Sequence, residues 1–259
     1  MKRRGRRAAR TAAIVEAYCD EVGLKRPKPY AEWCSDVVRD HGDLAIKFIA
    51  MAERRKFGDD GDDESIYPTK NANTRFSLDV AAQFTGNQHR EYLRWFLQQG
   101  FSPKRVIDVG CDNGVTTCAY ARFFPDAEVV GLDIVRASVK CCQRLARNLR
   151  LQNVRFVQGD LLTPVSTDVE AYDLVVASMV VYEAPSNEWG QMAKNLASLV
   201  APRRGRLVSF EPFADSALDS WLEELRGAGL LVESQDHVGF LTADDRPFDI
   251  TALVCRDRG

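Results

Sequence analysis

From residue 86 onward, short apolar runs alternate with segments in which apolar residues recur every three or four positions. The run Arg105–Val109 is β-branched and short, as buried strands are, whereas the segments between such runs have the length of helices. Strands are expected at 105–109, 127–132, 154–158, 173–178 and 206–210, and helices at 114–124, 136–150, 187–200 and 215–227. Strands that alternate with helices form right-handed βαβ units. The pattern therefore predicts an α/β fold, with a doubly wound, mostly parallel sheet covered on both faces.

The last part of the chain has a different pattern. Two further apolar runs, at 230–238 and 248–254, are separated by about nine turn-rich residues and no helix. A connection of this kind favours an antiparallel hairpin over another crossover.

The first 85 residues have a helical pattern only. Ile14, Val15, Tyr18 and Val22 lie at helical spacing, prolines follow at 27 and 29, and a helix pair hinged near Gly42 comes next. Residues 56–73 contain a dense acidic stretch, which predicts a mobile loop. We expect a helical N-terminal extension or lid at 1–85, followed by the main domain at 86–259.

Composition narrows the class of protein. The formal net charge is −2, so the whole-chain balance does not indicate a nucleic-acid coat, although six of the first ten residues are Lys or Arg. That basic start is consistent with a solvated terminus, a phosphate-binding arm or a targeting peptide. No apolar run is long enough to span a membrane. Seven cysteines without CxxC spacing favour reduced thiols in a cytoplasmic protein, and three isolated histidines argue against a metal site.

The densest signal is the segment Val-Ile-Asp-Val-Gly-Cys-Asp-Asn-Gly at 106–114, a strand that runs through a glycine turn into a helix. Ligands bind to such turns at the carboxyl ends of parallel strands. The GxGxxG spacing of dinucleotide sites is absent, and Asp108 and Asp112 bracket the turn. Two carboxylates repel phosphate and attract an ammonium or sulfonium group, and S-adenosylmethionine carries both of these cations.

Further acidic residues follow the next two strands. Asp133 lies at the end of the second strand, where it can accept hydrogen bonds from both hydroxyls of a ribose. Asp160 follows the third strand and can accept from the amino group of adenine. Ile134 and Leu161 are expected to sandwich the adenine ring.

With these motifs, residues 86–256 resemble the Rossmann-like class (class I) of S-adenosylmethionine-dependent methyltransferases. The segments that match, in the family's order, begin at Asp108, Gly131, Gly159, Asp173 and Gly205. The resemblance implies a seven-stranded sheet with an antiparallel last strand, with Gly110 and Gly114 against the methionine moiety, Asp133 on the ribose and Asp160 near the adenine. Asp112 stands where the family commonly has its middle glycine. The expected cofactor-binding residues are Asp108, Gly110, Cys111, Asp112, Gly114, Asp133, Ile134, Asp160, Leu161 and Ser178.

The segment after the fourth strand borders the reacting methyl group in this architecture. It supplies Tyr182 and Glu183 as candidate catalytic residues, and their alternative roles are plain packing for Tyr182 and a solvated or turn position for Glu183. Glu211 and His237 are weaker candidates. The Asn/Asp-Pro-Pro motif of enzymes that methylate base amino groups is absent after Ser178, as is an acidic pair that binds magnesium.

The expected activity is methyl transfer to an oxygen or nitrogen of a small molecule. Residues 71–84 are expected to cover the cofactor, and Tyr30, Trp33 and Trp189 to line an apolar substrate cavity, although such aromatic residues are more often core. The alternatives are an RNA methyltransferase that uses the basic N-terminus, a protein methyltransferase, and a non-catalytic cofactor-binding module. Asp108 and Asp112 argue against a nicotinamide oxidoreductase. The sequence leaves the oligomeric state open.

Overall fold

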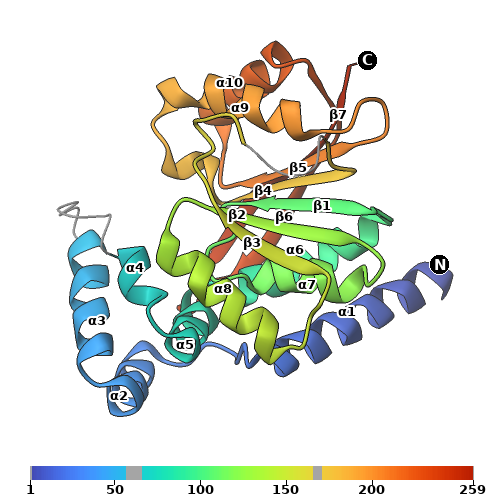
Figure 1. Cartoon of the computed structure of the whole chain (residues 1–259). Helices are drawn as coiled ribbons and strands as arrows, with labels where there is room; N and C mark the ends of the chain where they lie inside the picture. Colours follow the sequence, from blue (N-terminus) through green and yellow to red (C-terminus); the bar gives the residue numbers. More distant parts are fainter. Residues whose placement is uncertain (1, 57–65, 166–170, 259) are drawn as a thin grey trace.

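A computed structural model of the chain describes residues 2–56, 66–165 and 171–258. Its centre is a seven-stranded sheet in the order β3-β2-β1-β4-β5-β7-β6 (Figure 1). The strands are β1 (Arg105–Val109), β2 (Glu128–Asp133), β3 (Val154–Gln158), β4 (Leu174–Ser178), β5 (Arg206–Glu211), β6 (Leu230–Leu241) and β7 (Pro247–Asp257). β7 pairs antiparallel with both β5 and β6, and the pairs among β1 to β5 are parallel. The predicted α/β fold, with its antiparallel last strand, is confirmed.

Helices cover both faces of this sheet. They are α6 (Gly86–Gln99), α7 (Val115–Phe123), α8 (Arg136–Asn148), α9 (Trp189–Leu199) and α10 (Asp215–Gly227), with short 3-10 turns η2 (Val181–Glu183) and η3 (Ser186–Glu188) between β4 and α9. Successive residues of a strand point to opposite faces. In β1, Val106 packs towards α6, α7 and α8, whereas Ile107 and Val109 pack towards α9 and α10.

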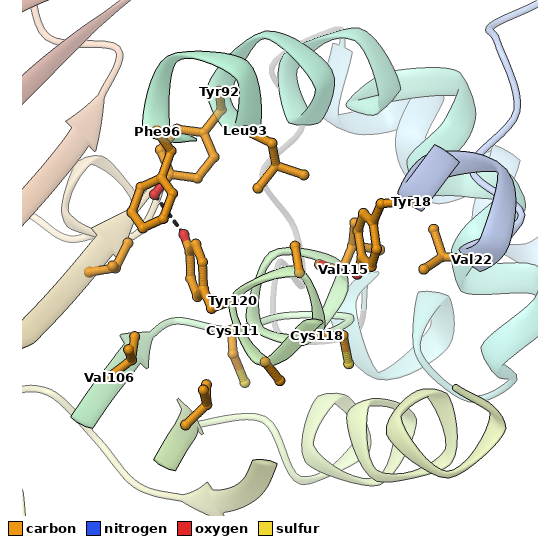
Figure 2. Close-up of a cluster of buried hydrophobic side chains, with 14 of the residues drawn as sticks. Tyr18, Val22, Tyr92, Leu93, Phe96, Val106, Cys111, Val115, Cys118 and Tyr120 are labelled. Atoms are coloured by element: carbon orange, nitrogen blue, oxygen red, sulfur yellow. Dashed lines mark hydrogen bonds between the residues drawn. The ribbon is translucent and has the colours of Figure 1, made fainter. Parts of the chain in front are cut away.

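The N-terminal residues form α1 (Lys2–Val22), α2 (Tyr30–His41), α3 (Asp43–Lys56), α4 (Ile66–Lys70) and α5 (Thr74–Phe84). α1 packs into the same core as the sheet: Figure 2 shows Tyr18 and Val22 beside α7, and the Tyr18 hydroxyl donates to the carbonyl oxygen of Val115. Nearby, the hydroxyls of Tyr92 and Tyr120 share a hydrogen bond of 2.6 Å. By contrast, α2, α3 and α5 enclose a smaller apolar cluster of their own. The division of the chain at residue 85 stays a prediction, but α1 is part of the main core.

The expected mobile loop at 56–73 is only partly described, because residues 57–65 lie outside the described residues. Its second half is helical. Ile66–Lys70 form α4, and Asn73 caps α5 by accepting from the backbone N–H groups of Arg75 and Phe76. The prediction of a loop is wrong for α4, because the acidic residues that favour a loop precede this helix. Among the described residues, no helix is long and apolar enough to cross a membrane.

Candidate functional site

A cavity of about 320 Å³ opens where β1, β2 and β4 end and where the segment after β3 begins. We call it the strand-end cavity. Its volume is at the lower end of the range of about 300–1,000 Å³ found for small-molecule sites. The residues that line it are Tyr67, Val109, Gly110, Asp112, Leu132, Asp133, Ile134, Val135, Gly159, Asp160, Leu161, Leu162, Met179, Val180, Glu183, Ala184 and Met192.

The glycine turn after β1 forms one wall of this cavity. Gly110 has a φ of +74°, and a Cβ atom there would lie 2.6 Å from Cγ2 of Val180. Only glycine fits both the conformation and the close approach. The backbone N–H of Gly110 donates to the Leu132 carbonyl at 2.8 Å, so the turn is fixed against the end of β2.

Asp133 is held rigidly at the end of β2. One carboxylate oxygen accepts from the backbone N–H of Asp112 at 2.7 Å and the other from that of Val135 at 2.8 Å. The residue is only 8% exposed, and burial, together with the charge of Asp112, raises the pKa of Asp133 to about 6. Each oxygen still has a lone pair for a second donor, so the carboxylate can accept hydrogen bonds from two neighbouring hydroxyls.

Asp160 lies on the same wall, in the turn after β3. Its Oδ1 atom accepts from the backbone N–H of Leu162 at 2.8 Å, which leaves Oδ2 to accept from a ligand. Leu161 is buried, and Ile134 is 60% exposed although both side chains line the cavity. An exposed isoleucine on a cavity wall offers an apolar surface to a flat ring.

Other predicted residues lie outside this cavity. Asp108 is buried beneath the turn, where it accepts from the hydroxyls of Thr116 and Thr117, and burial raises its pKa to about 7. Cys111 and Gly114 face Cys142 on α8: the two sulfur atoms are 3.8 Å apart, and a Cβ atom on Gly114 would lie 2.9 Å from Sγ of Cys142. These three residues pack between the turn and the helices, and their contact with a cofactor stays a prediction. Ser178 and Tyr182 also do not line the described part of the cavity.

The Asp112 side chain has a different role from the expected one. It lines the cavity, but its carboxylate accepts from Lys70 Nζ at 2.7 Å and from Asn71 Nδ2 at 2.9 Å. Burial alone would raise the pKa of Asp112, yet the Lys70 charge and these hydrogen bonds outweigh burial and lower the pKa. The carboxylate therefore ties the N-terminal extension to the turn, and its charge is neutralised by Lys70. Of the two acids expected at the turn, Asp108 lies beneath it and Asp112 is paired with Lys70, and cofactor binding by either stays a prediction.

Glu183 is the carboxylate that faces the cavity from the β4 side. It accepts from the Tyr67 hydroxyl at 3.0 Å and from Arg55 Nη2 at 3.2 Å. Burial and the charge of Glu183 raise the pKa of Tyr67, so its hydroxyl stays protonated at neutral pH. The arrangement places an anion and two hydrogen-bond donors at the open end of the strand-end cavity.

Glu211, at the end of β5, holds the backbone of the turn that carries Glu183. Its oxygens accept from the backbone N–H groups of Val180, Val181 and Tyr182 at 3.1–3.3 Å. Glu211 is buried and is not among the residues that line the cavity, so in this structure it positions the turn. His237 lies exposed on β6, outside the described part of the cavity.

A second, larger cavity of about 770 Å³ lies between the N-terminal extension and the turn from β6 to β7. We call it the outer cavity. Tyr67 lines both cavities. Of the aromatic residues expected around a substrate, Tyr30 lines the outer cavity. Trp33 packs between Tyr30 and Phe84, and Trp189 packs on Phe213, so both tryptophans belong to apolar cores.

Several residues of the site were not expected from the sequence. They are Arg55, Tyr67, Lys70 and Met192, whereas Met179 and Val180 lie in the segment after β4 that was expected to border the methyl group. The first three belong to the N-terminal extension, more than 40 residues before their partners Asp112 and Glu183, so no local spacing indicates them. Met179, the residue directly after β4, stands out only by its backbone conformation, with a φ of +56°. Within the described ranges, no three His, Cys, Asp or Glu side chains are grouped to hold a metal ion.

Comparisons with known proteins give the same fold. A family described as "Methyltransferase domain" matches residues 101–223. The chain is 34% identical to trans-aconitate 2-methyltransferase of Methylobacterium radiotolerans over 39% of this chain and 35% of that protein. It is 26% identical to phthiotriol/phenolphthiotriol dimycocerosates methyltransferase 1 of Mycobacterium ulcerans over 62% of this chain and 58% of that protein. The chain thus spans less than two thirds of the length of either relative.

A solved structure is similar over a larger share of the molecule. The N-methyltransferase NodS from Bradyrhizobium japonicum, in complex with S-adenosyl-L-homocysteine, has a TM-score of 0.53 at 17% identity, covering 66% of this chain and 87% of that one. The [4+2]-cyclase SpnF has a TM-score of 0.55, also at 17% identity, over 66% of this chain and 82% of that one. At these identities the likeness concerns the fold alone, and the function has to be argued from the site.

Proposed function

We propose that this chain, which belongs to the Rossmann-like class of S-adenosylmethionine-dependent methyltransferases, transfers the methyl group of that cofactor to an oxygen or nitrogen atom of a small molecule. The observation that carries the proposal is the pair of carboxylates, Asp133 and Asp160, on one wall of the strand-end cavity. Both are anchored by backbone N–H groups, and both keep acceptor positions for a nucleoside. Several curated relatives act on small molecules by name, which supports the choice of acceptor.

Different residues of the strand-end cavity fit different parts of this cofactor. Asp133 would hold the ribose hydroxyls, Asp160 would accept from the adenine amino group, and Ile134 and Leu161 would contact the ring. Gly110 and Glu183 would border the cofactor's methionyl end. The acids near that end are already paired or buried: Asp112 pairs with Lys70, Glu183 pairs with Arg55, and Asp108 lies beneath the turn.

When bound, the cofactor supplies a methyl group that its positive sulfur makes electrophilic. The chain then has to hold the nucleophile about 3 Å from that carbon and exclude water. α4 covers the open side with Tyr67, which is tied to Glu183. Glu183 takes the proton that an alcohol or amine loses, and Arg55 orients its carboxylate.

The state of the cysteines bears on the location of the protein. All seven cysteines are free, which supports a cytoplasmic location as part of this proposal.

Thermal shift with S-adenosylhomocysteine and with NAD tests the cofactor. We expect stabilisation by S-adenosylhomocysteine and none by NAD, and the reverse result would contradict the proposal. Incubation with methyl-labelled cofactor and a fractionated cell extract then tests the acceptor. Label in small molecules is expected, label in RNA or protein would favour those acceptors, and tight cofactor binding without any transfer would indicate a non-catalytic module.

Glu183→Gln tests the proposed base. Because a positioned base contributes about 10²–10⁴-fold, we expect kcat to fall by about 100-fold or more with little change in the KM for the cofactor. The matched control is Glu188→Gln in η3, five residues further on and outside the strand-end cavity, which should retain normal kcat. A Glu183→Gln enzyme with normal kcat at every pH would remove Glu183 from the mechanism.

A further inference from the structure

The lining of the outer cavity is mainly apolar, and four of its residues are aromatic, Tyr67 on α4 among them. Tyr30, Phe48 and Phe84 come from α2, α3 and α5, and Phe84 is 44% exposed although it is a large apolar side chain. Its ring centroid lies 6.3 Å from that of Phe48 and 6.4 Å from that of Tyr30. Phe84 is thus the exposed ring of the three, since Phe48 is buried and Tyr30 half-buried. Aromatic side chains that line a cavity favour a ligand with a ring, which can pack edge to face against them and bury apolar surface.

The cationic side chains of the outer cavity are paired with carboxylates. Lys70 binds Asp112 at 2.7 Å, Arg246 binds Asp244 at 2.9 Å, and Arg55 binds Glu183 at 3.2 Å. A carboxylate or phosphate on the ligand would have to displace one of these partners. Anionic ligands are therefore disfavoured, even though three cations line the cavity.

Glu53 is the remaining acidic residue of the lining, and its Oε1 atom accepts from the Tyr30 hydroxyl at 2.6 Å. That hydrogen bond leaves Oε2 as an acceptor for a hydroxyl or amide on a neutral ligand. A cationic ligand could pair only with this carboxylate, which already accepts from Tyr30, because the other acid of the lining, Asp244, is held by Arg246. The lining thus fits an uncharged molecule better than a charged one.

The junction of the two cavities determines how such a molecule is oriented. Tyr67 lines both, and its hydroxyl donates to Glu183. We infer that the outer cavity binds the methyl acceptor, and that the acceptor is an uncharged, ring-bearing apolar molecule whose nucleophilic group lies beside Tyr67. This inference rests on the proposed function and adds the chemical class of the substrate.

Three naphthalene derivatives test the class: 2-naphthol, the anion 2-naphthoate and the cation 2-naphthylmethylammonium. Each is titrated by its own fluorescence into protein saturated with S-adenosylhomocysteine. We expect 2-naphthol to bind at least about tenfold more tightly than either charged derivative, which corresponds to about 1.4 kcal/mol. Absence of 2-naphthol binding, or equal or tighter binding of a charged derivative, would overturn the inference.

Two variants assign the binding to this cavity. Ala52 on α3 lines the outer cavity, so Ala52→Trp fills it and should weaken 2-naphthol binding about tenfold or more. Ala50→Trp, on the exposed face of the same helix, is the matched control and should bind 2-naphthol normally. Phe84→Leu, a smaller change at a half-exposed position, should weaken binding severalfold even if Ala52→Trp does not fold.

The binding of S-adenosylhomocysteine separates this inference from the proposed function. If wild-type protein does not bind S-adenosylhomocysteine, the proposed function fails. If S-adenosylhomocysteine binds but Ala52→Trp and Phe84→Leu leave 2-naphthol binding unchanged, only the assignment of the outer cavity fails.

Discussion

Asp133→Asn is expected to weaken the binding of S-adenosylhomocysteine about 100-fold or more. The carboxylate already accepts from the backbone N–H groups of Asp112 and Val135, one on each oxygen, and each oxygen has room for a ribose hydroxyl. An asparagine side chain has only one oxygen that can accept. Its NH₂ group is a donor and would face one of the two backbone N–H groups, which are donors too. Because hydrogen bonds to a charged group contribute about 1.5–3 kcal/mol each, loss of one or two gives this range.

Isothermal titration calorimetry measures the effect, with Asp160→Asn as the matched control. Asp160 has one backbone donor and is half-buried, so we expect a loss of less than about tenfold there, as is usual for a partly solvated contact. A larger loss for Asp160→Asn than for Asp133→Asn would contradict the assignment of the ribose to Asp133.

The same residue predicts a pH dependence. The pKa of Asp133 in the free protein is raised to about 6, and the ionised form is the better acceptor for two hydroxyls. Affinity for S-adenosylhomocysteine should therefore rise between pH 5 and pH 7 in the wild type and change less in Asp133→Asn. Equal pH profiles for the two proteins would show that a different group controls binding.

The strands were predictable because buried parallel strands are short, continuous apolar runs, whereas their order in the sheet comes from the structure. β1 to β5 lie within about one residue of the predicted ranges. The same logic identified Asp133 and Asp160, since residues directly after parallel strands meet at one edge of the sheet. The position of a residue along the chain does not show in which direction its side chain points within a turn. Cys111 and Gly114 belong to the same motif as Gly110, yet they pack against Cys142.

The contacts of the N-terminal extension were beyond prediction for a different reason. Lys70 and Tyr67 meet Asp112 and Glu183 across 42 and 116 residues of chain, and these pairs depend on how α4 packs against α3 and α8. The acidic residues before α4 favoured a loop and concealed a short helix. The consequence for function is specific: the charge expected to attract a sulfonium at Asp112 is neutralised by a lysine from the extension.

Glu211→Gln is expected to lower both stability and cofactor affinity. In the wild-type protein, the two oxygens of Glu211 accept from three backbone N–H groups in the turn after β4. This turn carries the cavity residues Met179 and Val180. The amide nitrogen of glutamine cannot accept, so at least one buried N–H group loses its partner, at a cost of about 1–3 kcal/mol. We expect a lower midpoint of thermal unfolding and about tenfold weaker binding of S-adenosylhomocysteine, which corresponds to about 1.4 kcal/mol.

The pH dependence of unfolding distinguishes loss of this carboxyl from a general loss of packing. Burial, with a contribution from the Glu183 charge, raises the pKa of Glu211 to about 8, whereas the unfolded chain has the ordinary value of 4.5. Between these values the folded protein holds a proton that the unfolded chain releases, so the free energy of unfolding falls as pH rises from about 4.5 to 8. Asp108 and Asp133 act in the same direction, because their pKa values are raised to about 7 and about 6. The fall should therefore be smaller, but not absent, in Glu211→Gln, whereas Glu188→Gln should follow the wild type. Parallel curves for wild type and Glu211→Gln would mean that Glu211 does not hold its proton in the folded protein.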